Sequence, residues 1–536
     1  MKVLILGGTG VFGSRLARIL GRDGHQLTIA ARSLAPAQAL AAELKATALQ
    51  IDRNGDLAGL AGHDVIIDAA GPFHTYGADP YRLAKAALLS GAHYLDLADN
   101  AAFCTGITAL DSLARQADRA AISGLSSVPA ISSAAVRALC GSDQPIHIDG
   151  AILPGNQSPR GLAVMASILA QAGPPFPVYQ GGSWTTAPGW SDPQDYPLPG
   201  GLSRQGWRIE VPNTRLFPAH FGAKTVDFRA GLELGVMRYG LAAFAALRRR
   251  VPFPVTTPLV RAFRLAANLL APFGTGTGGM SVAVTTATHR HTWTLLATDG
   301  DGPFVPAIAI RALLRRPTLP VKAAPALEIV TLAEIEAAMS DLSIRCDRRT
   351  APLDPIFPRV LGPAFATLPE AVRATHQTAG TTRWTGRASV TRGTAAWSRL
   401  IATLFGFPPA TPDIPVDVTK TATAKGETWT RSFGNRSFRS QLRATAQGMT
   451  ERFGPFTFRL GLTVRDQALH YPVVAGRLGP LPLPRWLLPV SEAREYAIDG
   501  YFHFDVRLYA PVTGALMVHY RGHLRPKQPD DPSSPP

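Results

Sequence analysis

Cysteine is scarce in this sequence, since its 536 residues include only three, Cys104, Cys140 and Cys346. Their wide separation fits neither a disulfide framework nor the spacing of metal ligands, so we expect no metal site. The sequence also lacks an uninterrupted apolar run of about 18 residues, which a membrane-spanning helix needs. The apolar run in the opening MKVLILGG is too short for a signal peptide. These absences favour a protein of the reducing cytoplasm.

Lysine is scarce as well. Only eight of the 54 basic side chains are lysine, and they are scattered along the chain. The formal net charge of +16 is a reason to consider a nucleic-acid partner. However, the sequence has no basic run with interleaved aromatic residues and no nucleic-acid-binding motif. We therefore interpret the excess charge as a solvated surface and expect no nucleic-acid partner.

One arginine-rich segment, residues 238–274, combines basic residues with apolar residues at helical spacing. Helices of this kind can rest on an anionic membrane surface. They can equally be core helices whose arginines extend to solvent, which is the interpretation we favour. Peripheral contact with the inner membrane surface stays open as the alternative.

The first twenty residues, MKVLILGGTGVFGSRLARIL, have the order of a strand, a glycine turn and a helix. Val3 to Leu6 form an apolar run that is typical of a buried parallel strand. Glycines at such a turn let the backbone approach a pyrophosphate at the N-terminus of the helix. The pattern predicts a dinucleotide-binding turn made of Gly7, Thr9, Gly10, Val11, Phe12 and Gly13. A simple tight turn is the alternative.

The residues that follow the second expected strand, 26–31, indicate which dinucleotide binds. Arg32 and Ser33 stand where an acidic residue would bind the ribose 2′-hydroxyl of NAD. An arginine at this place accommodates the 2′-phosphate of NADP instead, so the sequence predicts NADP(H) as the cofactor. Asp52, at the end of the third expected strand, is a candidate contact for the adenine.

The fourth expected strand, 65–69, runs directly into Ala70, Gly71 and Pro72. Ligands of such sheets bind at the carboxyl ends of the strands. We therefore expect these three residues to lie beside the nicotinamide of the cofactor.

Four titratable residues near the strand ends are candidates for chemistry. His74 and Tyr76 are nearest to the fourth strand, and they are candidate catalytic residues. A loop histidine and a packing tyrosine are the alternatives. Asp96 and Asp99 follow the fifth strand and are either polar contacts or helix caps, of which we favour caps. No convincing acid–base pair emerges from the sequence.

Strands and helices alternate up to about residue 130 and not beyond it. This predicts an α/β protein that begins with a Rossmann-like, doubly wound parallel sheet over residues 1–130. An α+β domain for substrate binding or dimerisation is expected over 131–340, and a β-rich domain over 351–524. The proline-rich end, 525–536, is expected to be disordered.

Several segments together resemble the saccharopine dehydrogenase-like oxidoreductases. They are the glycine turn, AGPF at 70–73, GAHYLDL at 91–97, GLSSVP at 124–129 and WTLLATDGDGPFVPAIA at 293–309. The resemblance implies an NADP-binding Rossmann domain interrupted by an α+β substrate domain. The β-rich part resembles a domain of unknown function often attached to such reductases, with WTRSFG at 429–434 and ERFGP at 451–455 as hallmarks.

The sequence leads to two alternative hypotheses about function. In the first, the protein is an NADP(H)-dependent oxidoreductase that acts on a small molecule, and its apolar middle domain hints at a hydrophobic substrate. In the second, the Rossmann domain binds NADP(H) as a redox sensor, and the β-rich domain binds a lipid or a protein partner. We favour the enzyme, and a homodimer stays open as its assembly.

Overall fold

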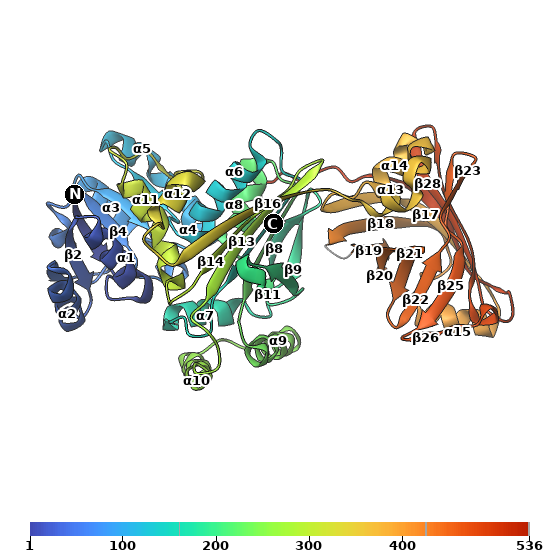
Figure 1. Ribbon diagram of the computed structural model, residues 1–536, viewed down its shortest axis with the longest axis horizontal. Helices are drawn as coiled ribbons and strands as arrows, with labels where there is room; N and C mark the ends of the chain where they lie inside the picture. Colours follow the sequence, from blue (N-terminus) through green and yellow to red (C-terminus); the bar gives the residue numbers. More distant parts are fainter. Residues whose placement is uncertain (160, 424–425, 534–536) are drawn as a thin grey trace.

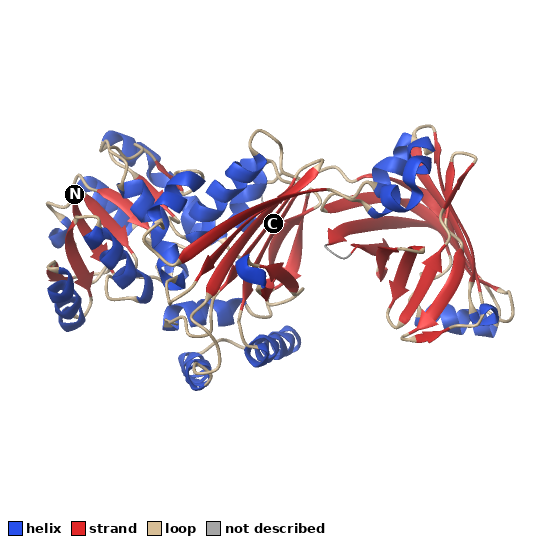
Figure 2. Ribbon diagram, in the orientation of Figure 1, coloured by secondary structure: helices blue, strands red, loops and turns tan. Residues whose placement is uncertain are grey.

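The computed structural model describes residues 1–159, 161–423 and 426–533. Within these ranges the strands form three large sheets and a small hairpin. Figure 1 shows the three sheets in a row, in the order in which the chain forms them. Figure 2 shows helices on the first two sheets and a strongly curved third sheet with few helices. The predicted fold class is confirmed.

The N-terminal sheet is entirely parallel, with the strand order β15-β6-β5-β4-β1-β2-β3. Strand order reverses between β1 and β4, which is the place where ligands bind in doubly wound sheets. The strands are β1 (Lys2–Leu6), β2 (Gln26–Ala31), β3 (Thr47–Gln50), β4 (Val65–Asp68), β5 (His93–Asp96), β6 (Ala121–Ser123) and β15 (Ala323–Pro325).

Helices cover both faces of this sheet, because its apolar strands are buried on each side. On α1, the residues at helical spacing, Leu16, Ile19 and Leu20, are fully buried. The other helices of this part are α2 (Leu34–Leu44), α3 (Arg82–Leu89), α4 (Ala101–Gly106), α5 (Asp111–Gln116), α6 (Ser132–Cys140), α11 (Ile308–Leu314) and α12 (Leu332–Ala338), with α1 at Val11–Arg22.

The middle sheet is mixed, with the order β10-β11-β12-β7-β13-β14-β16, and β7 and β12 are its parallel pair within the described ranges. Its strands are β7 (His147–Leu153), β10 (Gln194–Pro197), β11 (Ser203–Arg208), β12 (Thr225–Gly231), β13 (Gly278–Thr285), β14 (His289–Ala297) and β16 (Ile344–Pro352). Around it lie the β8–β9 hairpin (Pro175–Gln180, Ser183–Pro188) and the helices α7 (Leu162–Gln171), α8 (Pro212–Phe221), α9 (Gly235–Arg250) and α10 (Thr257–Leu269).

The sheets cross the predicted boundaries at 130 and 340. The chain leaves the first sheet after β6, builds most of the middle sheet, returns to the first sheet as β15 and rejoins the middle sheet as β16. One apolar core continues from Ile5 of β1 to Trp293 of β14, so the two parts are packed together without a gap. The sequence could not place these boundaries because strand pairing is not visible in local periodicity.

In the described residues the C-terminal sheet has thirteen strands, and all of their pairings are antiparallel. It curls around a core of aromatic and aliphatic residues. Its strands are β17 (Thr381–Arg392), β18 (Thr411–Thr423), β19 (Gly426–Phe433), β20 (Arg436–Thr445), β21 (Gly448–Phe453), β22 (Phe456–Leu460), β23 (Thr463–Arg465), β24 (Ala468–His470), β25 (Val473–Leu478), β26 (Leu481–Pro482), β27 (Val490–Ile498), β28 (Tyr501–Tyr509) and β29 (Leu516–Pro526). Its helices are α13 (Ile356–Leu361), α14 (Glu370–His376) and α15 (Ala396–Leu404).

The expected disorder of residues 525–536 is wrong for the part that the structure describes. After β29 the chain returns to the β8–β9 hairpin, where Asp530 Oδ2 accepts the Trp184 amide at 2.8 Å and the Asp530 carbonyl accepts the Tyr179 hydroxyl at 2.9 Å. The Asp530 amide donates to the Gly182 carbonyl at 2.7 Å. Residues 534–536 lie outside the described residues.

Candidate functional site: the glycine turn at the switch point

The glycine turn follows β1 and lies against the end of β4. Gly7 has a φ of +74° and donates its amide to the Ala30 carbonyl at 2.9 Å. A Cβ at Gly7 would lie 2.6 Å from the Cα of Ala70, closer than real Cβ contacts come. A Cβ at Gly13 would overlap the Gly7 carbonyl oxygen. Glycine is therefore required at both positions for close packing of turn, strand and helix.

The N-terminus of α1 faces this turn. Gly10 is its N-cap residue, and the Gly10 carbonyl accepts the Ser14 amide at 3.0 Å. The amides of residues 11–13 precede the first hydrogen bond of the helix, so they have no partner within it. No side chain of the described residues caps the helix, and no acidic residue lies in its first turn. Free amides and the helix dipole make this end suited to an anion such as a pyrophosphate.

The side chains predicted at this end differ in accessibility. Thr9 and Gly10 are exposed, while Val11 and Phe12 are half-buried. Contact of these residues with a dinucleotide stays a prediction, but their positions around the free helix end fit it.

Arg32 directly follows β2 and is exposed at the same edge of the sheet. Among the described residues, no carboxylate pairs with its guanidinium, so the charge is available to a phosphate. Ser33 is the N-cap residue of α2 and is also exposed. Asp52 accepts the Asn54 amide at 2.9 Å in a local turn, which leaves only part of its carboxylate for a ligand.

Two aspartates that end neighbouring strands form the buried floor of the site. Asp68 of β4 and Asp96 of β5 are register partners, and both are fully buried. Asp68 Oδ1 accepts the Ala70 amide at 3.0 Å and the Tyr76 hydroxyl at 3.1 Å. Asp68 thereby fixes the segment that begins at Ala70, where the nicotinamide is expected.

Asp96 connects the ends of β5 and β6. Its Oδ1 accepts the amides of Ala98 at 2.9 Å and Gly124 at 2.7 Å, and the hydroxyl of Ser123 at 3.0 Å. Burial, with a smaller contribution from the nearby Asp68, raises the pKa of Asp96 to about 7 against the effect of these donors.

The role of Asp96 as a helix cap is wrong, because the helix that follows β5 begins later. Asn100 caps α4, and its side chain accepts the Phe103 amide at 3.0 Å. Asp99 is exposed beside this cap. Sequence reasoning also overlooked Asp68, although both VIID and HYLD place an aspartate directly after apolar strand residues.

The two catalytic candidates lie in different surroundings. Tyr76 is buried against Phe73 and Phe103, with ring centroids 5.0 and 5.6 Å away, and the Arg53 guanidinium lies over its ring. Burial and the nearby Asp68 raise the pKa of Tyr76 well above its usual value, so its hydroxyl stays protonated. His74 is exposed on the short helix 73–75. Catalysis by either residue stays a prediction.

A change in the pH dependence of stability is expected from Asp96→Asn. Between about pH 4 and pH 7 the folded chain keeps the Asp96 proton that the unfolded chain has lost. The contribution of Asp96 to the free energy of unfolding is therefore complete below about pH 4. It falls by up to about 1.4 kcal/mol per pH unit as the pH rises to 7. The asparagine variant removes this slope. Urea midpoints of both proteins, followed by circular dichroism at about pH 5, 6 and 7, test it, and equal slopes would contradict it.

Comparison with known families assigns two parts of the chain. Residues 3–124 match the family model of the saccharopine dehydrogenase NADP binding domain. Residues 368–524 match a domain of unknown function, DUF4166. The chain thus joins an NADP-binding domain of the saccharopine dehydrogenase type to this second domain, and both predicted resemblances are confirmed.

Solved structures show weaker likenesses. Apo saccharopine dehydrogenase (L-Glu forming) from Saccharomyces cerevisiae is 16% identical and covers 65% of this chain and 99% of its own, with a TM-score of 0.47. The UDP-N-acetylglucosamine 3-dehydrogenase GnnA from Acidithiobacillus ferrooxidans is 12% identical and covers 66% of this chain and 84% of its own, with a TM-score of 0.27. No curated protein matches the chain.

Proposed function

We propose that the protein is an NADP(H)-dependent oxidoreductase that acts on a small apolar molecule. The observation that carries the proposal is the glycine turn, whose packing excludes a Cβ and whose free helix end lies at the switch point of the sheet. The match of residues 3–124 to an NADP-binding family supports it. When bound, the nicotinamide supplies hydride transfer.

Each part of the cofactor has a proposed contact. The turn from Gly7 to Gly13 would hold the pyrophosphate, Arg32 and Ser33 the 2′-phosphate, and Asp52 the adenine end. The segment 70–72 would lie against the nicotinamide. Asp68 orients this segment through the Ala70 amide and acts as a positioning residue.

The surroundings of the segment 70–72 favour an apolar substrate. Phe73, Tyr76 and Phe103 form an aromatic cluster directly after it, and Leu216 of α8 packs against this cluster from the middle domain. Apolar and aromatic walls with few polar groups are typical of sites for hydrophobic ligands.

Oxidation of NADPH tests the proposed activity. Loss of nicotinamide absorbance is measured with a panel of apolar aldehydes and ketones, against polar keto acids as the comparison. We expect turnover with apolar members. Tight NADPH binding without turnover of any compound would favour the second function, a redox sensor.

We propose in addition that helices α9 and α10 contact an anionic membrane surface. Few of their residues are buried, in contrast to the core helices that we expected, and apolar side chains such as Leu265, Leu269 and Phe273 are 62%, 69% and 65% exposed. The segment 235–273 contains six arginines and no acidic residue. Exposed apolar side chains beside arginines suit anionic lipid headgroups. No helix among the described residues is long and apolar enough to cross a membrane.

Vesicle flotation at low salt tests this contact. We expect the protein to float with phosphatidylglycerol vesicles and not with phosphatidylcholine vesicles, because each arginine near an anionic surface contributes about 1 kcal/mol. The double variant Leu265→Glu and Leu269→Glu should lose flotation. The control is Leu89→Glu, since Leu89 is 75% exposed on α3. If the double variant instead dissociates a dimer in sedimentation without changing flotation, the surface is a homodimer interface and the membrane proposal fails.

A further inference from the structure

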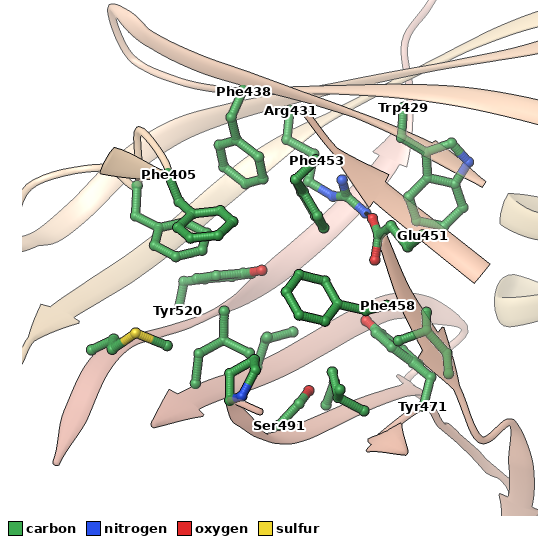
Figure 3. A pocket seen from close by; sticks show the side chains of 18 of the residues that line it. Phe405, Trp429, Arg431, Phe438, Glu451, Phe453, Phe458, Tyr471, Ser491 and Tyr520 are labelled. Carbon is green, nitrogen blue, oxygen red and sulfur yellow. Dashed lines mark hydrogen bonds and ion pairs between the residues drawn. The ribbon is translucent and has the colours of Figure 1, made fainter. Parts of the chain in front are cut away.

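The concave face of the C-terminal sheet encloses a cavity of about 410 Å³. Side chains alternate between the two faces of a strand, so every second residue points into it. On β28, for example, Phe502, Phe504, Val506 and Leu508 all line it. Figure 3 shows side chains from several strands converging on this space. Its size falls within the range of small-molecule sites.

Most of the lining is apolar, but charged residues enter the cavity wall in the middle of strands. Arg431 of β19 donates to Ser440 Oγ at 2.8 Å and to Glu451 Oε1 at 3.1 Å. The Ser440 hydroxyl also donates to Glu451 Oε1 at 2.6 Å. A core built only for stability gains little from such a buried ion pair, which apolar residues of the same size often replace without loss.

A second group of polar residues in the wall is already hydrogen-bonded within the protein. Lys420 donates to the Thr375 carbonyl at 2.7 Å, and its ammonium lies 3.8 Å from the centre of the Trp429 ring. Glu495 accepts from His376 at 2.5 Å and from the Tyr471 hydroxyl at 3.0 Å. These contacts leave little capacity for a ligand.

The remaining polar capacity lies around Arg431. In the described chain, nothing donates to Glu451 Oε2, and the Tyr520 hydroxyl has no hydrogen-bond partner. Neither atom is fully buried, and both residues line the cavity. In Figure 3, Arg431, Glu451 and Tyr520 all face the same space, with Phe453 and Phe458 beside them. The cavity thus offers donors and one free acceptor side by side.

The charges in the wall decide what ligand suits this site. The cations Arg431 and Lys420 are matched by the anions Glu451 and Glu495. A ligand carboxylate would lie beside Glu451 and meet like charge in a low-dielectric space, which is unfavourable. A hydroxyl group both donates and accepts, so it matches Glu451 and Tyr520 together.

We propose that this cavity binds an elongated apolar molecule that carries an uncharged hydroxyl group, and that Arg431, Glu451 and Tyr520 hold the hydroxyl. The site is separate from the cofactor turn. Figure 1 shows α1, which follows the cofactor turn, and the strands that line the cavity, such as β19 and β28, at opposite ends of the molecule. Ligand binding here therefore does not depend on the proposed oxidoreductase activity.

Nile red fluorescence of the full chain, measured without cofactor, tests whether the cavity binds apolar molecules. We expect a saturable signal for the wild type and its loss in Ser491→Trp, which fills the cavity from β27. The matched control is Glu492→Trp, because Glu492 is the next residue on the same strand and is exposed. An equal signal in both variants would overturn the proposal, since the dye would then bind elsewhere. NADPH binding should be unchanged in both, which separates this test from that of the cofactor site.

Competition with Nile red tests the ligand class. We expect dodecanol to displace the dye at a concentration about tenfold lower than dodecanoate does at neutral pH. Tyr520→Phe removes only one oxygen and is expected to fold. It should weaken dodecanol about 2- to 10-fold and leave dodecane unchanged. Preference for dodecanoate, or equal weakening of dodecanol and dodecane, would overturn the assignment of the hydroxyl site.

Discussion

Replacing Gly7 by alanine is expected to weaken NADPH binding by at least about 100-fold. The new Cβ would lie 2.6 Å from the Ala70 Cα and 2.7 Å from the Ala69 carbonyl oxygen, so the turn and the end of β4 must move apart. Displacements of about 1 Å in a site that orients reacting groups cost on the order of 100-fold in reaction rate, and we expect a similar sensitivity for the pyrophosphate held by this turn. Nicotinamide fluorescence during titration with NADPH measures the change.

Gly24→Ala is the matched control for this variant. Gly24 has a φ of +81°, close to the +74° of Gly7, but a Cβ there meets no atom of the described residues within 4 Å. Both variants therefore carry the cost of a left-handed alanine, and only the first carries the collision. Wild-type affinity in Gly7→Ala, with the fold verified by circular dichroism, would contradict the role of the turn.

Replacing Arg32 by alanine should weaken NADPH binding about 10- to 150-fold and leave NADH binding nearly unchanged. The variant removes a charge-assisted hydrogen bond to the 2′-phosphate, which NADH lacks. Separate titrations with the two dinucleotides measure this difference.

Arg115→Ala controls for the loss of one positive charge, because Arg115 is exposed on α5 and, among the described residues, forms its ion pair with Asp111 one helical turn away. It should not change either affinity. If Arg32→Ala weakens NADPH and NADH equally, the assignment of Arg32 to the 2′-phosphate is wrong.

Local sequence signals were sufficient to predict the strand, turn and helix at the start of the nucleotide-binding domain. The apolar run Val3 to Leu6 is a buried strand as predicted, and the predicted helix follows the glycines, with its apolar residues facing inward. These signals succeed because strand, turn and helix are adjacent in the chain, so their pattern depends on a few neighbouring residues.

Contacts between residues that are far apart in the sequence could not be predicted in the same way. Asp530 bonds to Trp184 across 346 residues, so composition alone could not show that the proline-rich end is ordered. For a related reason the sequence favoured core helices over outward apolar faces for α9 and α10, because periodicity shows that a helix has an apolar face but not what covers it.

The candidate site was likewise only partly visible. The glycines and Arg32 follow a known spacing, whereas Asp68 and Asp96 matter because adjacent strands bring them together. In the C-terminal domain the sequence predicted a β-rich fold, but only the curvature of the sheet turns strands such as β28 into a cavity wall. Curvature is set by many strands together and is absent from any single segment.

A titration of the full chain with NADPH and NADH is the decisive test of cofactor binding. We expect saturable binding of NADPH, followed by nicotinamide fluorescence, with NADH at least about tenfold weaker because it lacks the 2′-phosphate that Arg32 would hold. Absence of binding for both dinucleotides would contradict it. The glycine turn would then serve only to pack β1 against α1, and the proposed oxidoreductase activity would fall with it.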